Sequence, residues 1–202
     1  MQLHSGVPTI LKLMYAKHYA VFEQGLLNLN IIGVRSSSRR AGGFDDELHV
    51  VYKELPNVWV DAVFTITTDP GLTYLHDPMR RSGCAILLPG QYRRSHRIGV
   101  HKGRYAALVQ DKPMRIVRDV NRDAILDVET RLDEAIEGVF GINIHAADTN
   151  PFDNLDPSRV EVGAWSAGCQ VFKDSKEYRE FWSLVQRSSR VYGKSFTYTL
   201  LD

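Results

Sequence analysis

The chain has 202 residues, of which 44% are hydrophobic and 24% are charged, a composition typical of one globular domain with its own core. Lys and Arg number 25 and Asp and Glu number 24, so the formal net charge is +1, without the basic excess usual in nucleic-acid-binding proteins. We therefore expect no nucleic-acid partner. Two cysteines, Cys84 and Cys169, are too few for a disulfide scaffold.

The N-terminal segment lacks the pattern of an export signal. Lys12, Lys17 and His18 interrupt its apolar residues, and no small-residue cleavage site follows. No window approaches the ~20 apolar residues that a membrane span requires. We expect a chain that is made in the cytoplasm without a signal peptide and without a membrane span.

The first quarter of the chain predicts one helix and one loop. Apolar residues at helical spacing favour a helix over 8–29. Ser, Arg and Gly crowd together in 35–47, which indicates a solvated loop whose Arg35, Arg39 and Arg40 could form a basic patch.

From residue 48 onward, short runs rich in Val, Ile, Tyr, Phe and Thr alternate with turn residues and predict strands. A helix follows Cys169, with Asp174 or Ser175 as its N-cap. We expect a single β-rich α+β domain over 1–202, with a helix near each end: an N-terminal helix and loop appendage (1–47), a catalytic core (48–172) and a C-terminal helix and strand (173–202). The predicted strands are 48–55, 57–68, 84–88, 105–110, 113–119, 138–145, 160–165 and 195–201.

The segment WSAGCQVF (165–172) is the sharpest local feature of the sequence. Gly168 allows a tight turn before Cys169, and consecutive amides in such a turn can form an oxyanion hole beside a nucleophilic thiol. A buried structural cysteine is the alternative.

His145 ends the predicted strand GINIH, 24 positions before Cys169. A strand, a polar loop and a returning strand could bring the two side chains together, with His145 as the general base of the thiol. We expect them within hydrogen-bond reach, in an open cleft bordered by the 146–164 loop and the 96–105 hairpin.

The pattern Ile-His, a loop of some twenty residues and Ser-x-Gly-Cys resembles the active-site signature of the L,D-transpeptidase (YkuD-type) family, and FTITTDPG (64–71) is similar to that family's strand and Thr-Pro-Gly-like turn. The resemblance implies a β-sandwich or barrel that acts on peptidoglycan stem peptides without a cofactor. It also implies that Cys169 is the nucleophile and His145 its base, with the oxyanion hole and its support formed by Ser166, Ala167 and Gly168.

The chain departs from the family pattern at several positions. Ala167 stands where the family often has His, Val171 where it often has Arg or Asn, and Ala146 where Gly is common; the loop between His145 and the Ser-x-Gly-Cys run is also longer. Gln170 could supply a substitute polar contact. These departures concern the substrate and the acceptor rather than the Cys–His chemistry.

Further candidate residues lie in the 96–105 hairpin, where His101, Lys102 and Tyr105 could face substrate carboxylates or simply form an exposed basic turn. Cys84 is a rival nucleophile, with His76 or His96 as its partner. DVNRD (119–123) has calcium-loop spacing, but Ala124 replaces the usual Gly and Thr130 the usual Glu, so we expect a turn there. Without a compact zinc motif, we expect no metal.

These observations predict a cysteine-dependent enzyme that acts on peptidoglycan stem peptides through an acyl-enzyme, with hydrolysis favoured over transpeptidation. The expected setting is phage lysis or an injected effector, acting at the cell wall or in the periplasm after release or injection. The alternatives are a non-catalytic phage structural or cell-wall-binding module, and a cysteine protease or amidase with another substrate. The sequence leaves the oligomeric state open.

Overall fold

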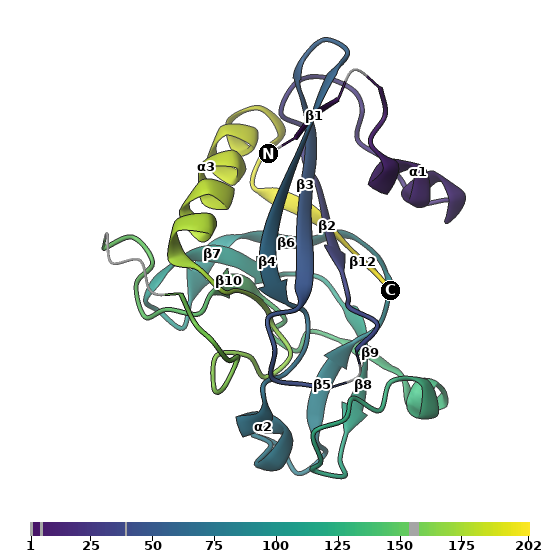
Figure 1. The fold of residues 1–202 in the computed structure, drawn as a ribbon, viewed down its shortest axis with the longest axis vertical. Coiled ribbons are helices and arrows are strands. Elements are labelled where there is room, and N and C mark those ends of the chain that lie inside the picture. Colours follow the sequence, from purple (N-terminus) through teal and green to yellow (C-terminus); the bar gives the residue numbers. More distant parts are fainter. Residues whose placement is uncertain (1, 5, 39, 154–157) are drawn as a thin grey trace.

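The computed structural model describes residues 2–4, 6–38, 40–153 and 158–202. Figure 1 shows strands at the centre of the molecule and helices around them. The elements, in chain order, are β1 (Gln2–His4), α1 (Thr9–Ala16), β2 (Asn30–Val34), β3 (Asp46–Leu55), β4 (Val58–Thr67), α2 (Leu72–His76), β5 (Cys84–Leu87), β6 (Gly90–His101), β7 (Tyr105–Gln110), β8 (Met114–Asp119), the 3₁₀ helix η1 (Glu129–Glu134), β9 (Ile136–Gly138), β10 (Ile144–Ala146), β11 (Gln170–Phe172), α3 (Ser175–Tyr192) and β12 (Ser195–Leu201).

Eight strands close into a barrel in the order β4-β11-β10-β7-β6-β12-β2-β3, because β3 pairs with β4 and joins the two ends of the row. β1 adds to β4 outside this circle. Two neighbouring pairs, β10–β11 and β12–β2, are parallel, whereas the other pairs in the barrel are antiparallel. The β-rich α+β class predicted from the sequence is confirmed.

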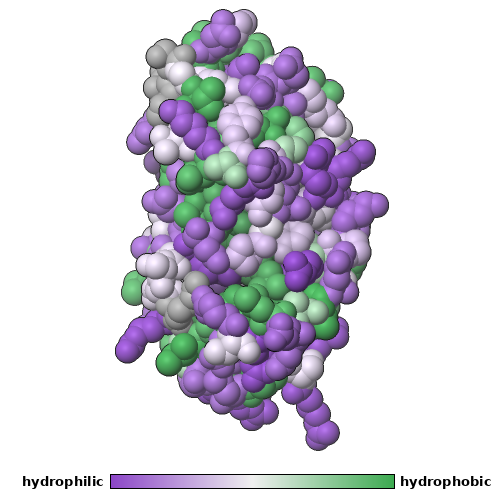
Figure 2. Space-filling view, turned by 90° about the vertical axis from the view of Figure 1, so that its right-hand side faces the viewer, coloured by the Kyte–Doolittle hydropathy of each residue, from purple (hydrophilic) through white to green (hydrophobic). Residues whose placement is uncertain are grey.

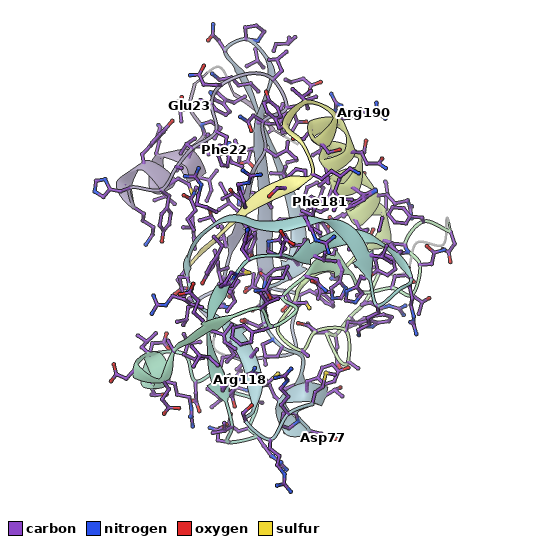
Figure 3. All side chains as sticks on the ribbon, turned by 180° about the vertical axis from the view of Figure 1, so that it is seen from behind. Phe22, Glu23, Asp77, Arg118, Phe181 and Arg190 are labelled. Carbon is purple, nitrogen blue, oxygen red and sulfur yellow. The ribbon has the colours of Figure 1, made fainter. Side chains whose placement is uncertain are left out.

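Helices α1 and α3 lie on opposite sides of the barrel strands, near the two ends of the chain (Figure 1). Successive side chains of a strand point to opposite faces, and β2 illustrates the result. Ile31 packs in the same core cluster as Phe181 of α3, whereas Ile32 packs with Leu11 and Met14 of α1. Figure 3 labels Phe181 on the side of α3 that faces the strands. Within the described ranges, no helix is both long and apolar enough to cross a membrane.

A second, three-stranded sheet of β5, β8 and β9 lies at one end of the barrel, next to α2 (Figure 1). Its core contains Leu75, Cys84, Ile86 and Val117, all at most 4% exposed. Figure 2 shows that hydrophilic side chains dominate one long face of the molecule and divide the hydrophobic ones into separate patches.

Three expected elements differ in the structure. The helix expected over 8–29 ends at Ala16, and His18 has a left-handed φ of 57°. The backbone beyond it is bound by side chains instead: Gln91 bonds both backbone groups of Ala20, and Asn30 bonds those of Phe22. The strand expected over 138–145 is split between β9 and β10, and 160–165 forms turns.

Arg35 is not part of a solvated basic patch. It is 3% exposed, its Nε lies 3.0 Å from Asp69 Oδ1, and it donates hydrogen bonds to Thr68 Oγ1 (3.1 Å) and Leu87 O (2.9 Å). Arg39 lies outside the described residues, and Arg40 is exposed and forms a backbone bridge with Ile125. The 1–47 segment also contributes β2, which lies between β12 and β3 in the barrel.

Candidate active site

The parallel pairing of β10 with β11 places His145 and Cys169 at one edge of the barrel. His145 lies opposite Val171, and Gln170 N–H donates to Asn143 O over 2.9 Å. Cys169 immediately precedes β11, and Asn143 immediately precedes β10, so these two residues lie side by side. Asn143 comes two residues before His145. Since strand residues two apart share a face, Asn143 and His145 point to the same side.

A tight turn over residues 166–169 presents the thiol. The fully buried Ser166 accepts a hydrogen bond from Gly168 N–H (3.1 Å) and donates one to Cys169 O (3.0 Å). Gly168 has a φ of +116°, and a Cβ there would collide with Ala85 O. In the described part of the chain, Cys169 N–H has no hydrogen-bond acceptor. Ser166 therefore stabilises the turn, and the Cys169 amide remains available to a ligand.

The Cys169 side chain is half-buried and its sulfur has two backbone neighbours. Its S–H donates to Gly141 O over 3.3 Å, and Asn143 N–H donates to Sγ over 3.5 Å. Burial raises the pKa of the thiol, and the Asn143 amide and the Lys102 ammonium offset only part of that rise. The resting group is a neutral thiol, which requires a base before it can attack.

One hydrogen bond fixes the orientation of the His145 ring. Its Nδ1–H donates to Ala146 O over 2.9 Å, which leaves the lone pair on Nε2. Nε2 is buried and has no hydrogen-bond partner among the described residues. The hydrogen bond expected between His145 and Cys169 is therefore not formed, because the Cys169 sulfur contacts Gly141 O and Asn143 N–H instead. Burial, together with the neighbouring His101, lowers the pKa of His145 to about 3, so the imidazole is neutral at pH 7.

The β6–β7 hairpin places a second histidine against the first. The His101 and His145 rings stack with centroids 3.9 Å apart and planes 18° apart, and Asn143 Nδ2 donates to His101 Nδ1 over 3.2 Å. Tyr105 packs against the two rings. Its hydroxyl oxygen lies 3.4 Å from His145 Nδ1 and donates a hydrogen bond to Ala146 O. The sequence analysis did not select Asn143, although the alternation in GINIH places it on the face of His145.

Both candidate residues line one pocket of about 220 Å³. The 96–105 hairpin contributes to it, as expected from the sequence, through His101 and Lys102. In the described part of the 146–164 loop, no residue lines it; Trp165, just after the loop, and the α2 region do so instead. The lining residues are Tyr74, Met79, His101, Lys102, Phe140, Gly141, Ile142, Asn143, His145, Trp165, Ala167 and Cys169.

Other residues selected from the sequence do not line this pocket. Gln170 is fully buried and accepts a hydrogen bond from the Tyr198 hydroxyl over 2.5 Å, so the structure does not bring it to the thiol. Cys84 is 4% exposed, burial raises its pKa to about 11, and its S–H donates to Ala167 O over 3.7 Å. His96 is fully buried against Ser95 and Ile142 O, and His76 contacts Arg122 O.

The acidic segment 119–123 forms a hydrogen-bonded turn. Asn121 Nδ2 donates to Asp123 (3.0 Å) and Asp127 (2.6 Å), and Asp123 accepts from Ile125 N–H. Across the described residues, no group of three or more His, Cys, Asp or Glu side chains could hold a metal ion.

Comparison of the chain with protein-family models, with curated proteins and with solved structures gives no match.

Proposed function

We propose that this protein is a cysteine-dependent enzyme that cleaves an amide bond in peptidoglycan stem peptides through an acyl-enzyme. One observation carries the proposal: a neutral histidine and a thiol line one pocket, and Nε2, the His145 nitrogen that can accept a proton, has no hydrogen-bond partner among the described residues. The choice of substrate rests on the resemblance of Ile-His and Ser-x-Gly-Cys to the L,D-transpeptidase family. The same resemblance supports an L,D-transpeptidase-like domain that acts at the cell wall.

The first half of the reaction forms the acyl-enzyme. Cys169 turns from Gly141 O towards His145, and the S–H proton moves to Nε2. The thiolate attacks the amide carbonyl carbon, and the resulting oxyanion accepts a hydrogen bond from Cys169 N–H, which has no other acceptor among the described residues. His145 returns the proton to the amide nitrogen, the C–N bond breaks, and the amine departs.

The second half regenerates the thiol. We propose water as the acceptor: His145 takes one of its protons, and the hydroxide adds to the thioester carbon. The C–S bond then breaks and His145 returns the proton to the sulfur, which gives a carboxylic acid and the thiol. Ala146 O holds Nδ1–H throughout and so keeps the base in one tautomer.

The test is digestion of purified muropeptides, with products identified by mass spectrometry. The wild-type protein should release a stem-peptide fragment with a new carboxyl group. Cys169→Ala and Cys169→Ser should be inactive, and His145→Ala should be slower by about 10²–10⁴-fold. Cross-linked products would show that the reaction is transpeptidation and not hydrolysis. Full activity of folded Cys169→Ala would remove the proposed nucleophile.

Alkylation separates an enzyme from a binding module that lacks a reactive thiol. Iodoacetamide should modify Cys169 faster than Cys84, because Cys84 is only 4% exposed, whereas Cys169 is half-buried and shares a pocket with His145. His145→Ala should slow the modification of Cys169 and leave that of Cys84 unchanged. Equal slow rates at both cysteines would favour an inert thiol, and thus a non-catalytic module.

A further inference from the structure

A second hollow, of about 170 Å³, adjoins the thiol pocket. The two share Met79, Phe140 and Ala167 as lining residues. Ala167 precedes Gly168 and Cys169 in the chain, and its carbonyl accepts the Cys84 S–H bond over 3.7 Å. A group bound in this hollow therefore lies next to the turn that carries the thiol.

Two arginines, Arg80 and Arg118, line this hollow. Arg118 extends from β8, where Figure 3 labels it in the smaller sheet at the α2 end of the molecule. Its guanidinium lies 5.4 Å from the centroid of the Phe140 ring, and Nη1 donates to Gly83 O over 3.1 Å. Its Nε is buried and has no hydrogen-bond acceptor among the described residues. The guanidinium is thus held in place while its buried Nε–H has no acceptor among the described residues.

Among the described residues, no carboxylate forms an ion pair with either arginine. Neither Arg80 nor Arg118 takes part in an ion pair there, although Arg35, Arg97, Arg131 and Arg187 all do. Burial, followed by the charge of Arg80, lowers the pKa of Arg118. Two like charges beside one another and an unused donor leave this hollow suited to an anion, and the planar fork of arginine matches a carboxylate in particular.

We propose that Arg118 and Arg80 form a subsite for a carboxylate of the substrate, adjacent to the bond that Cys169 attacks. This inference rests on the proposed function for its choice of substrate, and it narrows that choice to peptides with a free carboxylate near the scissile amide.

The test uses two alkylating reagents of similar size and different charge. Iodoacetate carries a carboxylate and iodoacetamide does not; both are attacked by the thiolate of Cys169, with loss of iodide. The readout is the ratio of the two rate constants at Cys169, followed by peptide mapping of the full chain so that Cys84 is scored separately. This readout needs a reactive thiol and does not require turnover.

Arg118→Gln should lower the iodoacetate-to-iodoacetamide ratio about fivefold, and Arg80→Gln should lower it less because that side chain is exposed. Arg115→Gln is the matched control: it lies on the same strand, removes the same charge and, three positions away, points to the other face. It should leave the ratio unchanged. Raising the salt concentration should lower the wild-type ratio towards that of Arg118→Gln.

An unchanged ratio in both Arg118→Gln and Arg80→Gln overturns the subsite, and so does an equal loss in Arg115→Gln, which would reflect net charge alone. A substrate series then joins the subsite to the reaction: amidation of the carboxylate nearest the cleaved bond should raise KM in the wild type and have little effect in Arg118→Gln. If the protein cleaves muropeptides but the arginine variants do not change the iodoacetate-to-iodoacetamide ratio, the proposed function stands and the subsite is wrong. If the ratio changes but no muropeptide is cleaved, the anion site stands and the proposed function is wrong.

Discussion

His101 and His145 stack face to face, with ring centroids 3.9 Å apart and planes 18° apart, although they come from strands that are not adjacent in the sequence. Protonating either ring would place a cation against the other ring, with little solvent around it. Burial and this proximity lower the pKa of His145 to about 3; burial and the charges of Lys102 and Arg104 lower that of His101 to about 4. The stack therefore keeps both imidazoles neutral at pH 7, and the same lowering of the pKa makes His145 a weaker proton acceptor.

Replacement of His101 tests this coupling. His101→Phe keeps an aromatic ring on His145 and removes the ring that can carry charge, so the pKa of His145 should rise towards 6.5 while staying below it, because burial remains. NMR titration of the His145 ring nitrogens is the measurement, and the acid limb of Cys169 alkylation should move to higher pH with it. A pKa of His145 that stays the same or falls would show that the stack has only a packing role.

Gly168 sets the position of the thiol through its backbone. Its φ of +116° disfavours any side chain, and an added Cβ would collide with Ala85 O. Gly168→Ala should lower the free energy of unfolding by roughly 1–3 kcal/mol and displace Cys169 from Gly141 and Asn143. Urea denaturation measures the first effect, and the alkylation rate of Cys169 measures the second.

Gly103→Ala is the matched control for Gly168→Ala. Gly103 also has a positive φ, +69°, but an added Cβ meets nothing within 4 Å. It should therefore show the backbone strain alone, with a smaller loss of stability and no change in thiol reactivity. Equal losses in the two variants would indicate that the contact with Ala85 O is relieved at no cost.

The buried ion pair between Arg35 and Asp69 should contribute far more to stability than an exposed one. Arg35→Met removes the cation 3.0 Å from a carboxylate that is itself buried, together with hydrogen bonds to Thr68 and Leu87 O, so it should cost about 3–5 kcal/mol. Arg97→Met breaks an exposed pair of similar length with Asp111 and should cost less than about 1 kcal/mol. Urea denaturation of both variants is the measurement; similar losses would contradict this difference.

The strands were accessible from the sequence because their apolar and β-branched residues alternate between well-marked turns. The runs that became β3, β4, β7, β8 and β12 were predicted within two residues at each end, and Asp174 caps α3 through Lys176 N–H and Glu177 N–H, as expected. The sequence also indicated that His145 and Cys169 lie close together: His145 lies within the short strand β10, Cys169 immediately precedes β11, and these two strands pair in parallel.

What the sequence could not supply depends on partners far along the chain. The helix expected over 8–29 stops early because Gln91, some seventy residues away, bonds the backbone of Ala20. Arg35 looked solvated because its partner Asp69 and its acceptor Leu87 O lie on other elements. For the same reason, the sequence did not predict the stack of His101 on His145 or the position of Arg118 near the thiol pocket. No local pattern indicates a contact between β6 and β10 or between the two sheets.

Buried neutral histidines should make the fold sensitive to mild acid. Burial lowers the pKa of His96 to about 4, whereas its value in the unfolded chain is near 6.5. Between these two values the unfolded state binds one more proton than the folded state, so stability rises with pH across this window and is lost as pH falls from about 6.5 towards 4, by up to about 1.4 kcal/mol per pH unit for each such proton. His101 and His145 act in the same direction. His49 acts in the opposite direction. Burial lowers its pKa, but the contacts with Asp61 and Glu47 raise it by more, so the pKa of His49 is raised overall.

Because these contributions overlap, the difference between variants is the informative quantity. His96→Gln should flatten the dependence of the unfolding free energy on pH between 7.5 and 5.5 by up to the share of one proton. The substitution should also lower stability at pH 7.5, because the wild-type His96 ring is fully buried and forms hydrogen bonds with Ser95 and Ile142 O that the variant loses. His18→Gln, at an exposed position, is the control variant. Urea denaturation at several pH values is the measurement. An identical slope in wild type and His96→Gln would mean that His96 takes up its proton in the folded state as readily as in the unfolded chain, which its burial against Ile142 O argues against.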